Sequence, residues 1–386
     1  MTRTHRAARW LAAAALVSAA LPVAAQLKVG TTIPLTGPAA VLGIGQRSAM
    51  GMYPDTIAGL KVEYITLDDA SDTTMAVTNA RKLVSENNVD IVVGSSTSPQ
   101  ALAMIDVVAD AQVPMIALGT STRIVDPVDA KRRWVFKIPP NDAIWIGGMV
   151  RHMVANGVKS VAFIGFADAF GESWLQELQK ATKEKNIAIA AVERFNRTDT
   201  SVTAQVLKIQ ASNADAVMVV ASGTPAALPV ITLKDRGYKG AVYLNAAIAS
   251  REFLQLAGKA AEGALLTVGV ALVNDQIPDS NPLKKVNGEY VARFEQKMGK
   301  QNLNIFAIQG YDVARILERA VPEAARRAKP GTREFRAALR DAIEGVRDLV
   351  ANTGIYNFSP TDHSGLDERA VVLVRVESGW FRYVPQ

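Results

Sequence analysis

The sequence predicts an α/β protein made of two Rossmann-like lobes, each with a parallel sheet flanked by helices. Short apolar segments alternate with amphipathic helical patterns from residue 27 to residue 244. This alternation is typical of parallel strands with helices on both faces. It comes in two similar rounds, which indicates two units of one design. A chain of 386 residues is also long enough for two domains of ordinary size.

The first round covers the N-terminal third of the chain. Alternating or fully apolar runs predict strands, and apolar residues at helical spacing predict helices. We expect strands at residues 27–33, 60–67, 91–93 and 113–118. We expect helices between them, at residues 41–52, 73–86 and 100–111.

The second round begins after residue 140 and repeats the alternation. We expect helices at residues 143–156, 171–185, 202–211 and 226–237. We expect strands at residues 160–166, 187–194, 216–220 and 241–244. Beyond residue 271 the pattern predicts helices at 283–298, 306–327 and 332–343, and then two final strands at 370–376 and 380–384.

Residues 1–25 have the pattern of a secretory signal peptide and are not expected in the fold. A basic start with Arg3, Arg6 and Arg9 precedes an apolar run at residues 10–21, and small residues end at Ala25. The apolar run is too short to span a membrane. We therefore expect cleavage after Ala25, a periplasmic location and no membrane insertion of the mature chain.

Composition argues against several function classes. The chain has no cysteine, which excludes a disulfide framework, a thiolate metal site and a cysteine nucleophile. Its 43 basic and 37 acidic residues form no basic stripe interleaved with aromatic residues, so we expect no nucleic-acid partner. His152 and His363 have no metal-ligand partner at helical spacing, and no catalytic motif occurs. We therefore expect no metal, no cofactor and no enzyme, with a hydrolase as an alternative.

The stretch with the clearest chemical signal is residues 91–102, which read IVVGSSTSPQAL. A buried strand turns at Gly94, and a run of hydroxyl residues leads into a helix. Ser98 suits the N-cap of that helix and Pro99 suits its first position. Hydroxyls and free N–H groups at a helix start, outside the carboxyl end of a strand, favour binding of a small anion.

Similar turns of small and hydroxyl residues follow two other strands, at residues 119–122 and 222–224. The first lies beside the stretch at 91–102 if consecutive strands pair, so both would hold one carboxylate without a formal positive charge. In the second round, Phe170 follows a strand at a helix start, and we expect it to contact the ligand. The alternative interpretation of all these turns is that they are ordinary helix caps.

Five segments resemble the periplasmic binding proteins of branched-chain-amino-acid-type ABC transporters. They are PLTGPAAVLG (34–43), GSSTSPQALA (94–103), VPMIALGTST (113–122), FADAFGES (166–173) and TGIYNFSPTDHSGL (353–366), in this order. The resemblance implies two lobes joined by three crossings, near residues 139–142, 267–274 and 349–353. It assigns residues 26–140 and 272–349 to an N-lobe, and residues 141–271 and 350–386 to a C-lobe.

The resemblance also implies which residues bind the ligand. In that family a carboxylate is held by the serine before the helix and by the turn after the next strand, which here are Ser98 and residues 119–121. The site residues expected from the turns and the resemblance together are Leu42, Ser96, Thr97, Ser98, Gly119, Thr120, Ser121, Asp142, Phe170, Ser222, Gly223, Thr224, Asn245 and Ala246.

Several positions depart from the pattern of amino-acid-binding members. A common tyrosine is Phe170 here, and aromatic residues common at the positions of Leu42 and Thr224 are missing. The acidic residue that pairs with the ligand ammonium is replaced by Asn245, although Asp142 matches a second acidic position. An unpaired ammonium in a closed cleft is costly.

We therefore predict a periplasmic receptor that captures a small carboxylate without an α-amino group, an aromatic or aliphatic organic acid. We expect it to be a monomer that delivers this acid to an ABC permease. One alternative is a receptor for branched-chain or other amino acids, with Asp142 holding the ammonium. Another is a sensory ligand-binding subunit for a signalling partner.

Overall fold

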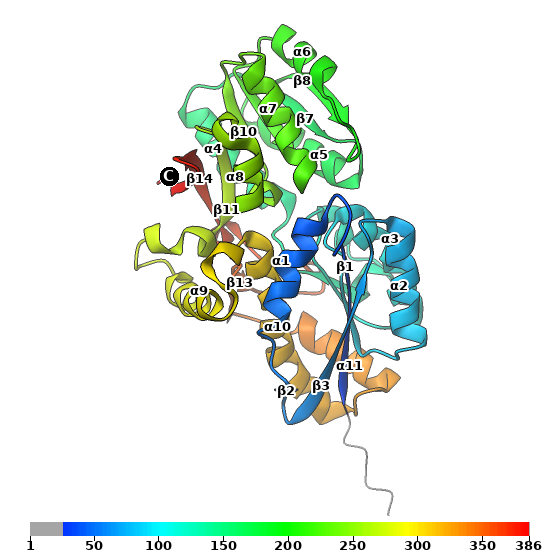
Figure 1. Ribbon diagram of the computed structural model, residues 1–386. Coiled ribbons are helices and arrows are strands. Elements are labelled where there is room, and N and C mark those ends of the chain that lie inside the picture. The colour runs from blue at the N-terminus through cyan, green and yellow to red at the C-terminus, as the bar shows by residue number, and fades with distance from the viewer. Residues whose placement is uncertain (1–25, 386) are drawn as a thin grey trace, which may run out of the picture.

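The computed structural model describes residues 26–385 and shows two α/β lobes, one above the other in Figure 1. The first sheet has the order β2-β3-β1-β4-β5-β6, and all its neighbours are parallel except β2 and β3. Its strands are β1 (Leu27–Ile33), β2 (Thr56–Ile57), β3 (Leu60–Asp68), β4 (Ile91–Gly94), β5 (Met115–Ala117) and β6 (Val135–Lys137). The α/β prediction is confirmed. β1, β3, β4 and β5 follow the expected ranges closely, whereas β2 and β6 were not predicted.

The second sheet has the order β15-β14-β11-β10-β9-β7-β8. Its strands are β7 (Ser160–Phe166), β8 (Ala188–Phe195), β9 (Ala216–Val220), β10 (Ala241–Leu244), β11 (Leu265–Gly269), β14 (Val371–Glu377) and β15 (Trp380–Tyr383). The pairs β11–β14 and β14–β15 are antiparallel. A separate small pair consists of β12 (Leu349–Val350) and β13 (Ile355–Tyr356). The interior strand β9, AVMVV, is buried along its whole length, as expected where helices cover both faces of a sheet.

Helices cover both sheets and place residues distant in sequence side by side. The helices are α1 (Ala40–Met50), α2 (Thr73–Ser85), α3 (Ser98–Ala111), α4 (Asp142–Ala155), α5 (Ala169–Glu184), α6 (Thr203–Ala211), α7 (Ala227–Asp235), α8 (Arg251–Ala257), α9 (Lys284–Met298), α10 (Ile305–Arg327) and α11 (Arg333–Glu344). The largest helix contacts join α1 with α10, α10 with α11, and α2 with α3. The start of α10 therefore lies in the first lobe, although it comes late in the chain (Figure 1).

The last passage between the lobes involves the segment after β12. Thr353 N donates to Asp312 at 2.6 Å, Tyr356 OH donates to Ile138 O at 3.0 Å, and Lys137 N donates to the carbonyl oxygen of His363. These contacts tie residues 353–363 to the first lobe, and the chain joins the second sheet only at β14. The division into lobes stays a prediction, and the contacts favour a last crossing after residue 363 over the predicted 349–353.

Two sequence predictions concern the membrane. The predicted signal peptide, residues 1–25, lies outside the described residues. Within residues 26–385, no helix combines the length and the apolar character that a membrane span requires.

Candidate functional site

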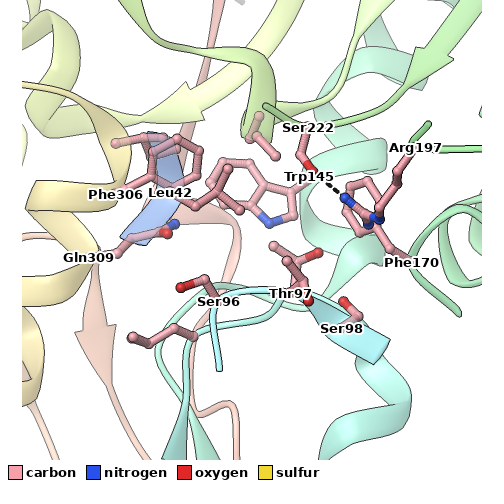
Figure 2. Close-up of a pocket in the computed structure, with 15 residues that line it drawn as sticks. Leu42, Ser96, Thr97, Ser98, Trp145, Phe170, Arg197, Ser222, Phe306 and Gln309 are labelled. Carbon is pink, nitrogen blue, oxygen red and sulfur yellow. Dashed lines mark hydrogen bonds between the residues drawn. The ribbon is translucent and has the colours of Figure 1, made fainter. Parts of the chain in front are cut away.

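A cavity with about 430 Å³ of empty space lies between the lobes and is lined from both (Figure 2). Its lining consists of Leu42, Ser96, Thr97, Ser98, Leu118, Thr120, Trp145, Phe170, Arg197, Ser222, Ala246, Ala247, Ile305, Phe306 and Gln309. From the predicted site residues, this set contains Leu42, Ser96, Thr97, Ser98, Thr120, Phe170, Ser222 and Ala246. Turns after β4, β5, β9 and β10 bring most of them together, because these strands end at the edges that face the other lobe.

The turn after β4 supplies the hydroxyl side of the cavity, which lies at the bottom of Figure 2. Gly94 starts it with a φ of 123°, and a Cβ atom there would lie 2.0 Å from the carbonyl oxygen of Thr32. Only glycine fits such a backbone next to β1. Ser96 is buried, and its hydroxyl bonds the side chain of Gln46 on α1.

Ser98 does not cap helix α3, so that prediction is wrong by one residue. The N-cap is Thr97, whose backbone is extended and whose side chain makes no cap bond. Ser98 is the first helical residue, and its Oγ accepts from Ser121 N at 3.2 Å. Each residue in the run of hydroxyl residues could begin the helix. Ser98 Oγ is not the cap because it accepts from Ser121 N, in the turn after β5.

Two hydroxyls of the lining are buried without a hydrogen-bond partner among the described residues. They are the Oγ1 atoms of Thr97 and Thr120, and the Thr120 hydroxyl lies beside the carboxylate of Asp142, where it opposes the rise in the pKa of that carboxyl. A buried hydroxyl without a partner costs about 1–3 kcal/mol, so both favour a ligand group that accepts from them. Together with the N-terminus of α3, they are suited to a carboxylate.

The opposite side of the cavity contains a cation that the sequence analysis missed. Arg197 follows β8, and its guanidinium lies over the ring of Phe166, 4.2 Å from the ring centroid. Its Nε donates to Asp168 at 2.7 Å and its Nη1 to Ser222 Oγ at 3.0 Å, as Figure 2 shows for Ser222. Burial lowers the pKa of Arg197, and the carboxylate of Asp168 opposes this effect.

The apolar part of the lining was also only partly predicted. Trp145 comes from α4, and Phe306 and Gln309 come from α10. Leu118, Ala247 and Ile305 complete the residues that the sequence analysis missed. A signal existed only for Leu118 and Ala247, which are directly next to predicted site residues in the sequence. The α10 residues reach the cavity because α10 packs on α1, and no local pattern reports that packing.

Comparison with known proteins decides the family. The chain matches the model of a family described as periplasmic binding protein over residues 26–379. The chain belongs to this family. The family prediction made from the sequence is confirmed.

This chain is similar in sequence to two of the following proteins and in fold to the third. An extracellular ligand-binding receptor from Rhodopseudomonas palustris HaA2 is 40% identical, with a TM-score of 0.90 over 93% of this chain and 100% of that one. Leu/Ile/Val-binding protein homolog 7 of Brucella abortus is 24% identical over 94% of this chain and 92% of its own length. A solute-binding protein of R. palustris in complex with benzoate has a TM-score of 0.80 at 19% identity, covering 93% and 95% of the two chains. This last likeness shows the fold alone.

Asp142 is the one acidic residue that the prediction placed near a ligand ammonium, and the cavity lining of this binding protein does not include it. It is fully buried, and its Oδ2 accepts from Ser173 OH at 2.5 Å and from Thr122 N at 3.3 Å. Burial raises the pKa of Asp142 to about 6, against the influence of the nearby Lys137. Asp142 Oδ2 thus bonds internal groups from both lobes, whereas Asp142 Oδ1 is buried without a hydrogen-bond partner among residues 26–385.

Five other predicted residues are outside the lining of the cavity. They are Gly119, Ser121, Gly223, Thr224 and Asn245. Asn245 Oδ1 accepts from Ala221 N at 2.9 Å and so fixes the turn that carries Ser222. Within residues 26–385, no group of three or more His, Cys, Asp or Glu side chains could hold a metal ion.

Proposed function

We propose that this periplasmic binding protein captures a small organic acid without an α-ammonium group and delivers it to an ABC permease from the periplasm. One observation carries the proposal: the only charged side chain in the cavity lining of the described chain is the cation Arg197. Asp168 bonds Arg197 and the start of α5, and Asp142 is buried outside the lining with its Oδ2 bonded to Ser173. A ligand ammonium would find no carboxylate in this lining, whereas a carboxylate finds several donors.

The ligand carboxylate is proposed to bind Thr97, Ser98 and Thr120, with its body between Trp145 and Phe170. The unpartnered hydroxyls of Thr97 and Thr120 support this placement. The ligand would then touch both lobes, and any ligand that contacts both lobes favours the closed arrangement over an open one. The name of the Brucella relative points instead to amino acids, which makes amino-acid binding the main competing outcome.

A thermal-shift screen of the mature protein tests the proposed ligand class. One panel holds α-amino acids and the other holds benzoates, phenyl-substituted acids and short aliphatic acids. A ligand at 100 times its Kd adds about 2.7 kcal/mol of stability, which raises the melting temperature measurably. We expect hits in the second panel; hits confined to the first would contradict the proposal.

The carboxylate anchor can be tested with Thr97→Val and Thr120→Val, which remove a hydroxyl and nearly conserve shape. Hydrogen bonds to a charged group contribute about 1.5–3 kcal/mol, so each change is expected to weaken binding of a screened acid roughly tenfold or more. The same change at Thr78, exposed on α2, is the control and leaves affinity unchanged. Equal affinities for all three variants in calorimetric titrations would remove these hydroxyls from the site.

Lobe closure can be tested at Gly223, where the second lobe meets the first. Its φ is 68°, and a Cβ atom there would lie 2.2 Å from the carbonyl oxygen of Pro38. Gly223→Ala should therefore push the lobes apart and weaken ligand binding about fivefold or more, since overpacking against backbone atoms costs about 1–3 kcal/mol. Gly237→Ala is the matched control, because Gly237 has a φ of 71° with nothing within 4 Å of its Cβ. If both variants lose affinity equally, the contact with Pro38 has no role in closure.

A further inference from the structure

We propose that Arg197 and Ser222 form a second polar subsite, which binds an acceptor oxygen at the end of the ligand opposite its carboxylate. This inference rests on the proposed function and narrows the ligand class to acids with two polar ends. The acceptor is a hydroxyl or second carboxylate oxygen. The subsite lies across the cavity from the hydroxyls of Ser96, Thr97 and Ser98 (Figure 2).

The guanidinium of Arg197 has donors to spare. Nε donates to Asp168 and Nη1 to Ser222 Oγ, while a guanidinium carries five N–H donors in a planar fork. Nη2 makes no hydrogen bond to the described residues. Arg197 lines the cavity, and its Nη1 donates to Ser222, which lines the cavity as well.

The position of this guanidinium is fixed before a ligand arrives. Asp168 Oδ1 accepts from Phe170 N and Gly171 N at 2.9 and 3.2 Å, so the start of α5 fixes the carboxylate. Its Oδ2 then holds Arg197, whose other face is covered by Phe166. The Arg197 side chain is only 19% exposed. A donor held in this way loses little conformational entropy when a ligand binds.

The chemistry of the pair selects what binds. Asp168 balances the charge of Arg197, so the subsite offers directed N–H groups rather than a large net charge. Ser222 Oγ already accepts from Arg197, and its own hydroxyl proton can be donated to a ligand oxygen. The N–H groups of Arg197 and the hydroxyl proton of Ser222 therefore favour an acceptor oxygen of the ligand at this end. Between the two polar ends of the cavity, the side chains of Phe170 and Trp145 are suited to contact the apolar middle part of the ligand.

A series of acids of increasing length tests this subsite by isothermal titration calorimetry. The parents are benzoate, phenylacetate and 3-phenylpropanoate, and each is compared with its para-hydroxy and para-carboxy derivatives. A bond to a charged donor is worth about tenfold to a hundredfold in affinity. We expect at least one derivative to bind tighter than its parent by this factor, because one length will span the cavity.

Arg197→Met is expected to abolish the difference between that derivative and its parent. Arg197→Lys keeps the positive charge but lacks the planar guanidinium. This variant should therefore keep part of the affinity difference. Arg194→Met is the matched control, because Arg194 lies nearby at the end of β8, exposed and paired with Glu172, and it should preserve the difference. Ser222→Ala is expected to reduce the affinity difference between derivative and parent less than Arg197→Met does. It is the variant to measure if Arg197→Met does not fold.

Three outcomes overturn the proposal and are distinguishable. If the parents bind and no derivative gains affinity at any length, there is no second subsite, while the organic-acid function stands. If Arg197→Met weakens parent and derivative by the same factor, Arg197 binds the carboxylate that they share. If no acid of the series binds while α-amino acids do, the proposed function fails and this inference fails with it.

Discussion

Asp312→Ala is expected to lower the free energy of unfolding by about 3–5 kcal/mol, because it leaves several buried donors without a partner. Asp312 lies on α10 and is fully buried. Its carboxylate accepts from Asn352 N at 2.8 Å, from Asn352 Nδ2 at 2.9 Å and from Thr353 N at 2.6 Å. The change removes every one of these bonds, at the segment that leads from the first lobe towards β14.

Urea unfolding of the ligand-free protein measures this effect. Asp279→Ala is the control, because the Asp279 side chain is fully exposed and its nearest cation, Lys284, lies 3.9 Å away. Such a surface pair contributes about 0–1 kcal/mol. If the two variants unfold at the same urea concentration, the carboxylate of Asp312 does not stabilise this segment.

Asp142→Asn is expected to destabilise the protein by about 3 kcal/mol or more, because it removes the main counter-charge of the buried Lys137 and leaves only the weaker influence of Asp362. Lys137 is fully buried, and its Nζ donates to Thr120 O at 2.6 Å. Burial lowers the pKa of Lys137 to about 8, and Asp142 opposes this shift. Lys137→Met on the Asp142→Asn background should restore most of the stability, since it removes the unpaired charge.

This pair also predicts a pH dependence with a definite sign. Asp142 has a folded-state pKa of about 6, above its ordinary value, so its contribution to stability is present near pH 4 and is lost as pH rises through 6. Lys137 has a lowered pKa of about 8, so its contribution is lost as pH falls from above 10 through 8. The stability of the native protein relative to the double variant should therefore be lowest between pH 6 and 8. A constant difference across this range would contradict the assignment.

The sequence predicted the fold well because the signals for it are local. The segment around β9 is apolar throughout and α5 begins at an Asp cap, so each element could be placed within a few residues. The signal at residues 95–98 was equally local. Its helix start was misplaced at Ser98, because four adjacent hydroxyl residues compete for one cap.

The missed parts of the site depend on long-range packing. Arg197 is a lone arginine after a strand, and only the folded chain shows that it lies over Phe166 and reaches Ser222. Phe306 enters the cavity because α10 packs against α1. Asp142 was predicted as a site residue from its position in the sequence, but its side chain bonds Ser173 inside the protein. Periodicity reports the face on which a residue lies, and it does not report which distant element meets that face.

Calorimetric titration with two matched ligand pairs tests the central claim most directly. Phenylalanine differs from 3-phenylpropanoate, and leucine from 4-methylpentanoate, only by the α-ammonium group. A buried ammonium without a carboxylate partner costs several kcal/mol, so we expect the acid to bind about a hundredfold tighter than the amino acid in at least one pair. If leucine or phenylalanine binds tighter than its matched acid, the cavity accommodates an ammonium group and the proposed ligand class is wrong.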